Sequence, residues 1–176
     1  HQDIYVKTLF GMAKGHLAGL NYQAAAPFAL QAFEQTKQLA DANRSAWLGG
    51  FVNAAILYAS ICSKTGENAQ SIDVLTQLLP ITDGLQQRNP DIWLEDHAWV
   101  VHTLTMSYLL AGAMPSAKQV IESVMPLLES EKEKSAELPG HYLNVKAMHM
   151  TCLLGTGDKE GAARGAESLI SLTREE

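Results

Sequence analysis

The chain has 176 residues, a net charge of −6 and a hydrophobic content of 47%, which is the composition of a folded domain rather than a disordered segment. The acidic balance argues against direct contact with nucleic acid. Only six prolines occur, and Val, Ile and Thr form no alternating runs, so strands have little support. We therefore expect an all-α protein.

The remaining composition bears on the cellular setting. No apolar run approaches the roughly 20 residues of a membrane span, so we expect no membrane contact. The sequence starts at His1 without a signal peptide, which indicates an excised or processed piece whose flanks could carry other functions. Two cysteines, Cys62 and Cys152, are too few for a disulfide scaffold. Both lie in apolar helical stretches, so we expect buried, inert, unpaired thiols and a cytoplasmic location.

Taken in chain order, the spacing of apolar residues predicts eight helices. Asn89 and Pro90 suit a helix start, with Asn at the cap and Pro at the first helical position. Pro27 falls in the first turns of its helix, where a missing N–H costs little. Pro80 and Pro126 fall late, so we expect those helices to kink or end early. The predicted helices span residues 3–19, 22–40, 44–65, 68–84, 90–111, 115–134, 140–155 and 159–174.

The helices repeat in pairs. Small residues recur at Ala25, Ser71, Ala117 and Ala162, at spacings of 46, 46 and 45 residues, and periods of 20–50 residues are typical of solenoids. Apolar residues follow each anchor at offsets of 4, 7 and 8, which mark one helix face. The turn within each pair carries a shared column, Leu20, Gly66, Gly112 and Gly157, that suits a helix end with left-handed backbone. Twelve residues before each anchor lies a second column: Ala13, Ala59, Thr105 and Met150.

These patterns predict one domain over residues 1–176, an α-α superhelix, or solenoid, of about four antiparallel helical hairpins. The expected repeats span residues 3–41, 44–87, 90–135 and 139–176.

The repeat resembles the tetratricopeptide repeat. The first repeat has the small and turn residues of that pattern at Ala13, His16, Asn21, Tyr22, Ala25, Ala29 and Ala32, and the fourth has them at Gly157, Asp158 and Ala162. The usual period is about 34 residues, so the chain is similar to long-period versions such as the sensor superhelix of bacterial LuxR-type ATPase regulators, including the maltose regulator. HEAT-type repeats are the alternative architecture. The resemblance implies a scaffold or sensor that binds proteins or peptides.

In stacked hairpins of this kind the first helices line a concave groove. The register predicts groove-facing residues that could grip an extended peptide, with Asn amides bonding its backbone and Trp99 as an aromatic anchor. The alternatives are a simply solvated wall and, for Trp99, a place in the core. The predicted peptide-binding residues are Lys7, Phe10 and Lys14 in the first repeat, Asn53 and Ile56 in the second, Trp99, His102 and Met106 in the third, and Asn144 in the fourth.

No nucleophile motif, phosphate loop or dinucleotide fingerprint occurs, so we expect neither an enzyme nor a cofactor. His97 and His102 are five apart, which misaligns them on a helix, and no third metal ligand accompanies them. The leading interpretation is a non-catalytic module that binds a protein or peptide segment, within a larger bacterial regulatory protein. The alternative is a small-molecule effector sensor of a transcriptional regulator. Oligomerisation stays open.

Overall fold

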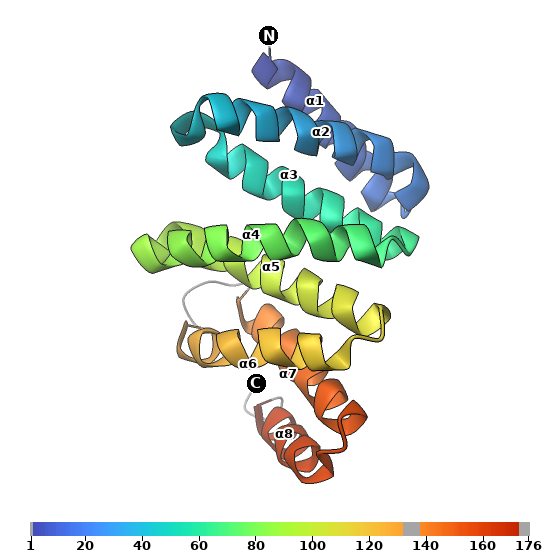
Figure 1. Ribbon diagram of the computed structural model, residues 1–176, viewed down its shortest axis with the longest axis vertical. Helices are drawn as coiled ribbons and strands as arrows, with labels where there is room; N and C mark the ends of the chain where they lie inside the picture. Colours follow the sequence, from blue (N-terminus) through green and yellow to red (C-terminus); the bar gives the residue numbers. More distant parts are fainter. Residues whose placement is uncertain (1, 132–137, 173–176) are drawn as a thin grey trace. The chain divides into compact units, whose positions relative to one another are not determined.

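The computed structural model describes residues 2–131 and 138–172, and all regular structure within these ranges is α-helical. The all-α prediction is confirmed, and the helices follow one another in chain order (Figure 1). Their bounds agree with the predicted ones to within a few residues. They are α1 (Gln2–Ala18), α2 (Tyr22–Ala42), α3 (Arg44–Thr65), α4 (Asn68–Arg88), α5 (Pro90–Leu110), α6 (Met114–Glu131), α7 (Leu138–Gly155) and α8 (Lys159–Leu172).

In residues 1–78 and in residues 79–176 alike, helices pack against their neighbours along the chain, which is a solenoid-like arrangement. Helix α2 contacts both α1 and α3, and α6 contacts both α5 and α7. Helix α7 also contacts α8 and α5. Between α3 and α4, the Tyr58 hydroxyl donates a hydrogen bond to the Gln70 amide oxygen at 3.3 Å. Sequential packing of this kind means that each helix depends mainly on its immediate neighbours.

The turns inside the four hairpins share one hydrogen-bond pattern. In each turn a backbone N–H bonds to the carbonyl five residues earlier, which closes the preceding helix. The column that contains Leu20 supplies the left-handed residue, with φ of 86° at Gly66, 74° at Gly112, 90° at Gly157 and 55° at Leu20. The repeat is therefore present in the backbone itself. The bonds run from Asn21 to His16 at 2.9 Å, and from Glu67 to Cys62, Ala113 to Tyr108 and Asp158 to Leu153 at 2.8 Å.

The small residues of the predicted columns lie inside the protein. Ala25, Ser71, Ala117 and Ala162 are all buried. Ala13, Ala59 and Thr105 are buried too, whereas Met150 is half-buried. A Cβ placed on Gly165 of α8 would lie 2.9 Å from Cγ of Met150, so the last hairpin reaches close packing through a glycine instead of through the column residue.

We expected Pro80 and Pro126 to kink their helices or end them early, and of these two outcomes the early end does not occur. Helix α4 continues to Arg88 and α6 continues to Glu131. A proline inside a helix removes one backbone hydrogen bond, but packing beyond it can retain the helix. Thr82 and Leu128, each two residues past its proline, are buried, and this burial holds the final turns in place.

The chain forms two compact units, His1–Leu78 and Leu79–Glu176, whose boundary falls within α4. The core of the first unit includes Ala29, Ile61 and Cys62. The core of the second includes Ile121 and Val145. The expectation of a single repeat domain over residues 1–176 stays a prediction.

Within the described part of the chain, one helix, α3, is long and apolar enough to cross a membrane by length and composition. In this structure its apolar residues serve the core. Val52, Ile61 and Cys62 are buried, and α2 packs along the helix. Its exposed residues lie at its two ends and at Asn53, so core packing accounts for the composition of α3.

The buried hydroxyls of Thr36 and Ser107 bond to carbonyls of their own helices. The Thr36 hydroxyl donates to the Ala32 carbonyl at 2.7 Å, and the Ser107 hydroxyl donates to the Thr103 carbonyl at 2.8 Å. A buried hydroxyl that lacks such a partner costs about 1–3 kcal/mol. The local bonds remove that cost without a network between helices.

Candidate binding wall on helices α5 and α7

Helix α5 has two different faces. One face carries buried residues such as Ala98, Val101 and Leu104. The other carries Trp99, whose side chain is 38% exposed. An exposed tryptophan opposite a packed face is unusual for a side chain with this much apolar surface. Partial exposure is what the groove interpretation requires of Trp99, and a place in the core stays the alternative interpretation.

Two histidine rings contact the indole ring of this tryptophan and each other. The Trp99 and His102 rings are stacked with centroids 5.7 Å apart. His141 of α7 meets Trp99 edge-on at 4.6 Å and His102 at 5.6 Å. Contacts of this geometry are worth about 0.5–1.5 kcal/mol beyond simple area burial. They hold the indole in one orientation, so little conformational entropy would be lost on binding.

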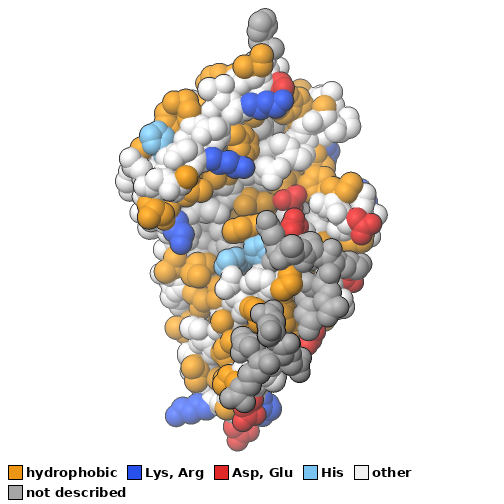
Figure 2. All heavy atoms as spheres, turned by 180° about the vertical axis from the view of Figure 1, so that it is seen from behind, with side chains coloured by type: hydrophobic (Ala, Val, Ile, Leu, Met, Phe, Trp, Pro, Cys, Tyr) orange, Lys and Arg blue, Asp and Glu red, His pale blue; other side chains and the backbone are white. Residues whose placement is uncertain are grey.

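We call the residues around this cluster the α5–α7 wall: Trp99, His102 and Met106 of α5 with His141 and Asn144 of α7. Met106 is half-buried and packs against the core of the second unit. Asn144 is exposed, and its amide can donate and accept hydrogen bonds at once. Within the wall, His102 is half-buried and His141 is buried; Figure 2 shows one face of the protein, with its histidine side chains in pale blue. The wall thus combines an oriented aromatic ring with an exposed amide.

The predicted groove residues of the first unit occupy α1 and α3. Lys7 is exposed and pairs with Asp3 at 2.8 Å. The Lys14 ammonium lies 5.9 Å from the centre of the Phe10 ring, and Phe10 packs against the core of the first unit. Ile56 is half-buried. Asn53 is exposed, so the column Lys7, Asn53, Trp99 and Asn144 is exposed at all four positions.

His141 is not among the binding residues predicted from the sequence. It lies three residues before Asn144, and residues three apart share a helix face. This spacing alone could have placed His141 on the same helix face as Asn144. The contact with Trp99 joins α7 to α5. A contact between two helices cannot be predicted from the spacing of residues along one helix.

His97, two residues before Trp99, has a different environment. It is buried, and its Nδ1 lies 3.0 Å from the Thr82 hydroxyl of α4. Burial lowers the pKa of His97, and the charge of Asp83 opposes this only in part. Among the described residues, no group of three or more His, Cys, Asp or Glu side chains is arranged to hold a metal ion.

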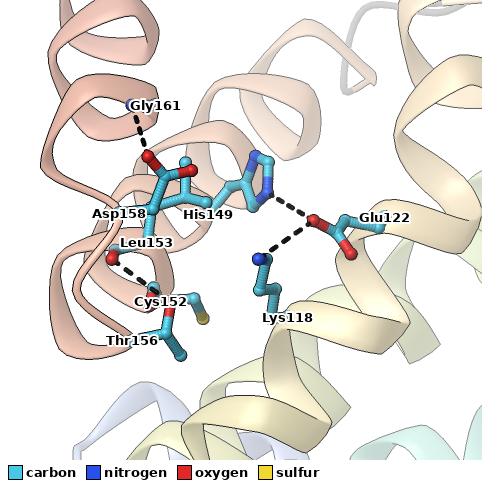
Figure 3. A network of polar contacts seen from close by, with 8 residues as sticks. All are labelled: Lys118, Glu122, His149, Cys152, Leu153, Thr156, Asp158 and Gly161. Atoms are coloured by element: carbon cyan, nitrogen blue, oxygen red, sulfur yellow. Dashed lines mark hydrogen bonds and ion pairs between the residues drawn. The ribbon is translucent and has the colours of Figure 1, made fainter.

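A second polar cluster joins α6 and α7 (Figure 3). Lys118 and His149 both point to the Glu122 carboxylate, each at 3.6 Å. Cys152 lies nearby on α7, and burial raises the pKa of its thiol. The cluster ties two neighbouring helices together through partly exposed charges, which contribute little to stability.

The predicted burial of both thiols is confirmed. Cys62 and Cys152 are free and buried. Burial, with a smaller contribution from the charge of Glu67, raises the pKa of Cys62 to about 11. A thiol with a raised pKa carries little thiolate at neutral pH and is a poor nucleophile.

Comparison of the chain with protein-family models, with curated proteins and with solved structures finds no match.

Proposed function

We propose that the chain is a non-catalytic, helical-repeat module that binds a segment of a partner protein along the α5–α7 wall. The observation that carries the proposal is Trp99, 38% exposed and held by His102 and His141. Tryptophan is among the residue types most enriched at binding hot spots. Its indole covers a large apolar area at low entropic cost.

An extended peptide fits the wall better than a small effector does. Small-molecule sites are concave and enclose most of their ligand, whereas Trp99 and Asn144 stand at the surface of their helices. An exposed amide can pair with the backbone of a peptide that lies alongside. The effector-sensor alternative would instead require a site that encloses its ligand.

The biological setting is proposed on the tetratricopeptide-like pattern alone. We take the module to be the scaffold or sensor part of a larger bacterial regulator in the cytoplasm. Its partner would be a protein or peptide, without direct contact to nucleic acid or a membrane. The acidic net charge of −6 supports the exclusion of nucleic acid.

The test is selection of short peptides from a random displayed library against the wild-type protein, followed by calorimetric affinities for single variants. We expect Trp99→Ala to weaken binding by roughly thirtyfold, the effect of about 2 kcal/mol at a hot spot. Asn144→Ala should weaken it less.

The matched control is Leu20→Ala, which removes an apolar side chain that is 71% exposed on a turn of the first unit. Its affinity should equal that of the wild type. If the selected peptides bind Trp99→Ala as tightly as the wild type, the α5–α7 wall is not their binding site.

A further inference from the structure

The outer face of α1 carries a row of exposed residues with large apolar side chains. Ile4 is 67% exposed, Tyr5 is 50% exposed and Met12 is 43% exposed. Thr8 lies between them and is exposed as well. Residues at these spacings share one side of a helix. We call Ile4, Tyr5, Thr8 and Met12 the α1 face.

The equivalent face of α3 is covered. Forty-six residues later, the columns of Tyr5, Thr8 and Met12 hold Phe51, Ala54 and Tyr58. Ala54 and Tyr58 are buried and Phe51 is half-buried. Phe33 of α2 stacks on both rings, with centroids 5.9 Å from Phe51 and 5.4 Å from Tyr58. The second helix of one hairpin therefore inserts its aromatic residue between these two columns.

The same columns are buried again later in the chain. In α5 they hold His97, Val100 and Leu104, and all three are buried. In α7, Tyr142 and Val145 of these columns are buried as well. Thr82 of α4 approaches His97 at 3.0 Å. Within the described chain, α1 is the first helix of a hairpin whose face stands exposed at these columns.

A helix face that stands exposed at the end of a repeat stack is expected to be polar. The α1 face departs from this, because two of its four residues are Ile and Met and a third is Tyr. Its residues match, column by column, a surface that elsewhere receives the second helix of a hairpin. The fitting occupant is therefore an α-helix with the apolar spacing of α2, α4, α6 or α8.

We propose that the α1 face binds helix α8 of a second copy of the chain, so that copies associate head to tail. Ile170 of α8 occupies the column of Phe33 and is 51% exposed, whereas Phe33 itself is half-buried. Ile170 would pack between Tyr5 and Met12 of the next copy, as Phe33 packs between Phe51 and Tyr58. The proposal does not depend on the function assigned to the α5–α7 wall.

Two different surfaces meet in this contact, so it is heterologous, and the assembly keeps one unused face at each of its two ends. Association should therefore be concentration-dependent and continue beyond the dimer. It should also be broken from either side by a charge, because a buried unpaired carboxylate is costly.

The experiment is sedimentation velocity of the full chain over a wide range of concentrations, with Met12→Glu and Ile170→Glu as the two variants. Both positions are exposed, so the helical circular dichroism of the variants should equal that of the wild type. We expect the wild-type sedimentation coefficient to rise with concentration and each variant alone to stay monomeric.

A mixture of the two variants is the decisive experiment. Ile170→Glu keeps an intact α1 face, and Met12→Glu keeps an intact α8. We expect the mixture to form dimers and nothing larger. Leu110→Glu, at a position 57% exposed on α5, is the control and should associate like the wild type. A monomeric wild type, or a mixture that stays monomeric, would overturn the proposal.

Discussion

The indole of Trp99 on α5 meets the imidazole of His141 on α7 edge-on, with ring centroids 4.6 Å apart. Helices α5 and α7 open two successive hairpins, and this contact joins them at the surface. The contact has a direct consequence for stability, because Trp99 contributes to a ring cluster without filling the core.

Trp99→Ala should therefore cost less stability than truncation in the core of the same helix. Core Leu→Ala changes cost about 2–5 kcal/mol, and we expect Leu104→Ala, at a buried position, to fall in that range. Trp99→Ala should cost less than Leu104→Ala in urea unfolding. An equal or larger loss at Trp99 would place its side chain among the core residues.

Ala117→Leu should destabilise the protein. Ala117 is buried in the core of the second unit, and added side-chain atoms in a packed site typically cost about 1–3 kcal/mol. The control is Ala163→Leu on α8, whose side chain is exposed. We expect a lower urea midpoint for the first variant and little change for the second; equal midpoints would contradict the packing of this column.

Leu20→Gly should stabilise the protein slightly. Leu20 has φ of 55°, a left-handed backbone that costs a non-glycine residue about 1–2 kcal/mol. The greater freedom of glycine in the unfolded chain offsets about 0.5–1 kcal/mol of the gain. The reciprocal change Gly66→Ala, at φ of 86°, should destabilise. Thermal melts of both variants check the signs, and a lower melting temperature for Leu20→Gly would count against this account.

Both thiols should react slowly with iodoacetamide in the native protein at neutral pH. Burial raises the pKa of each thiol, to about 11 for Cys62, which leaves little thiolate. In urea the pKa values return to about 8.5 and both thiols become accessible. We expect two equivalents of label per chain only after unfolding, measured by mass spectrometry without reductant. A mass showing a 62–152 disulfide would contradict the free, buried state.

His97 should make stability depend on pH in the acid range. Burial holds its pKa below the ordinary value, which is about 6.5. The unfolded chain therefore binds a proton more readily, and the free energy of unfolding falls as the pH is lowered below that value. We expect His97→Phe, which copies the residue at Phe51 in the same column, to lose less stability between neutral and mildly acid pH. An unchanged pH dependence would remove His97 as its source.

Most of the fold was predictable because the second helix of each hairpin is amphipathic and each hairpin turn carries the same left-handed position. Gly66, Gly112 and Gly157 indicated those turns in the sequence. The sequence left open whether the late prolines kink or end their helices, since helix continuation past Pro80 depends on burial of Thr82 against neighbouring helices. That burial is a tertiary effect, which local propensity does not contain.

The candidate site was only partly predictable. The register identified the column of Trp99 and Asn144, because one helix period fixes which residues share a face. It could not pair His141 with Trp99, since that contact depends on how α5 and α7 lie against each other. The boundary between the compact units was not foreseen either, because the repeat continues unchanged through α4.

The hydroxyls of Thr36 and Ser107 bond to carbonyls of their own helices, so neither depends on the identity of an adjacent hairpin. The bond between Thr82 and His97 is different, since it joins two hairpins through specific side chains. A gene segment that encodes a hairpin with only local hydroxyl bonds can be duplicated or inserted elsewhere without leaving a buried polar atom unpaired. Apolar shape alone must then match at the new junction, which is the easier condition for an array to meet as it lengthens.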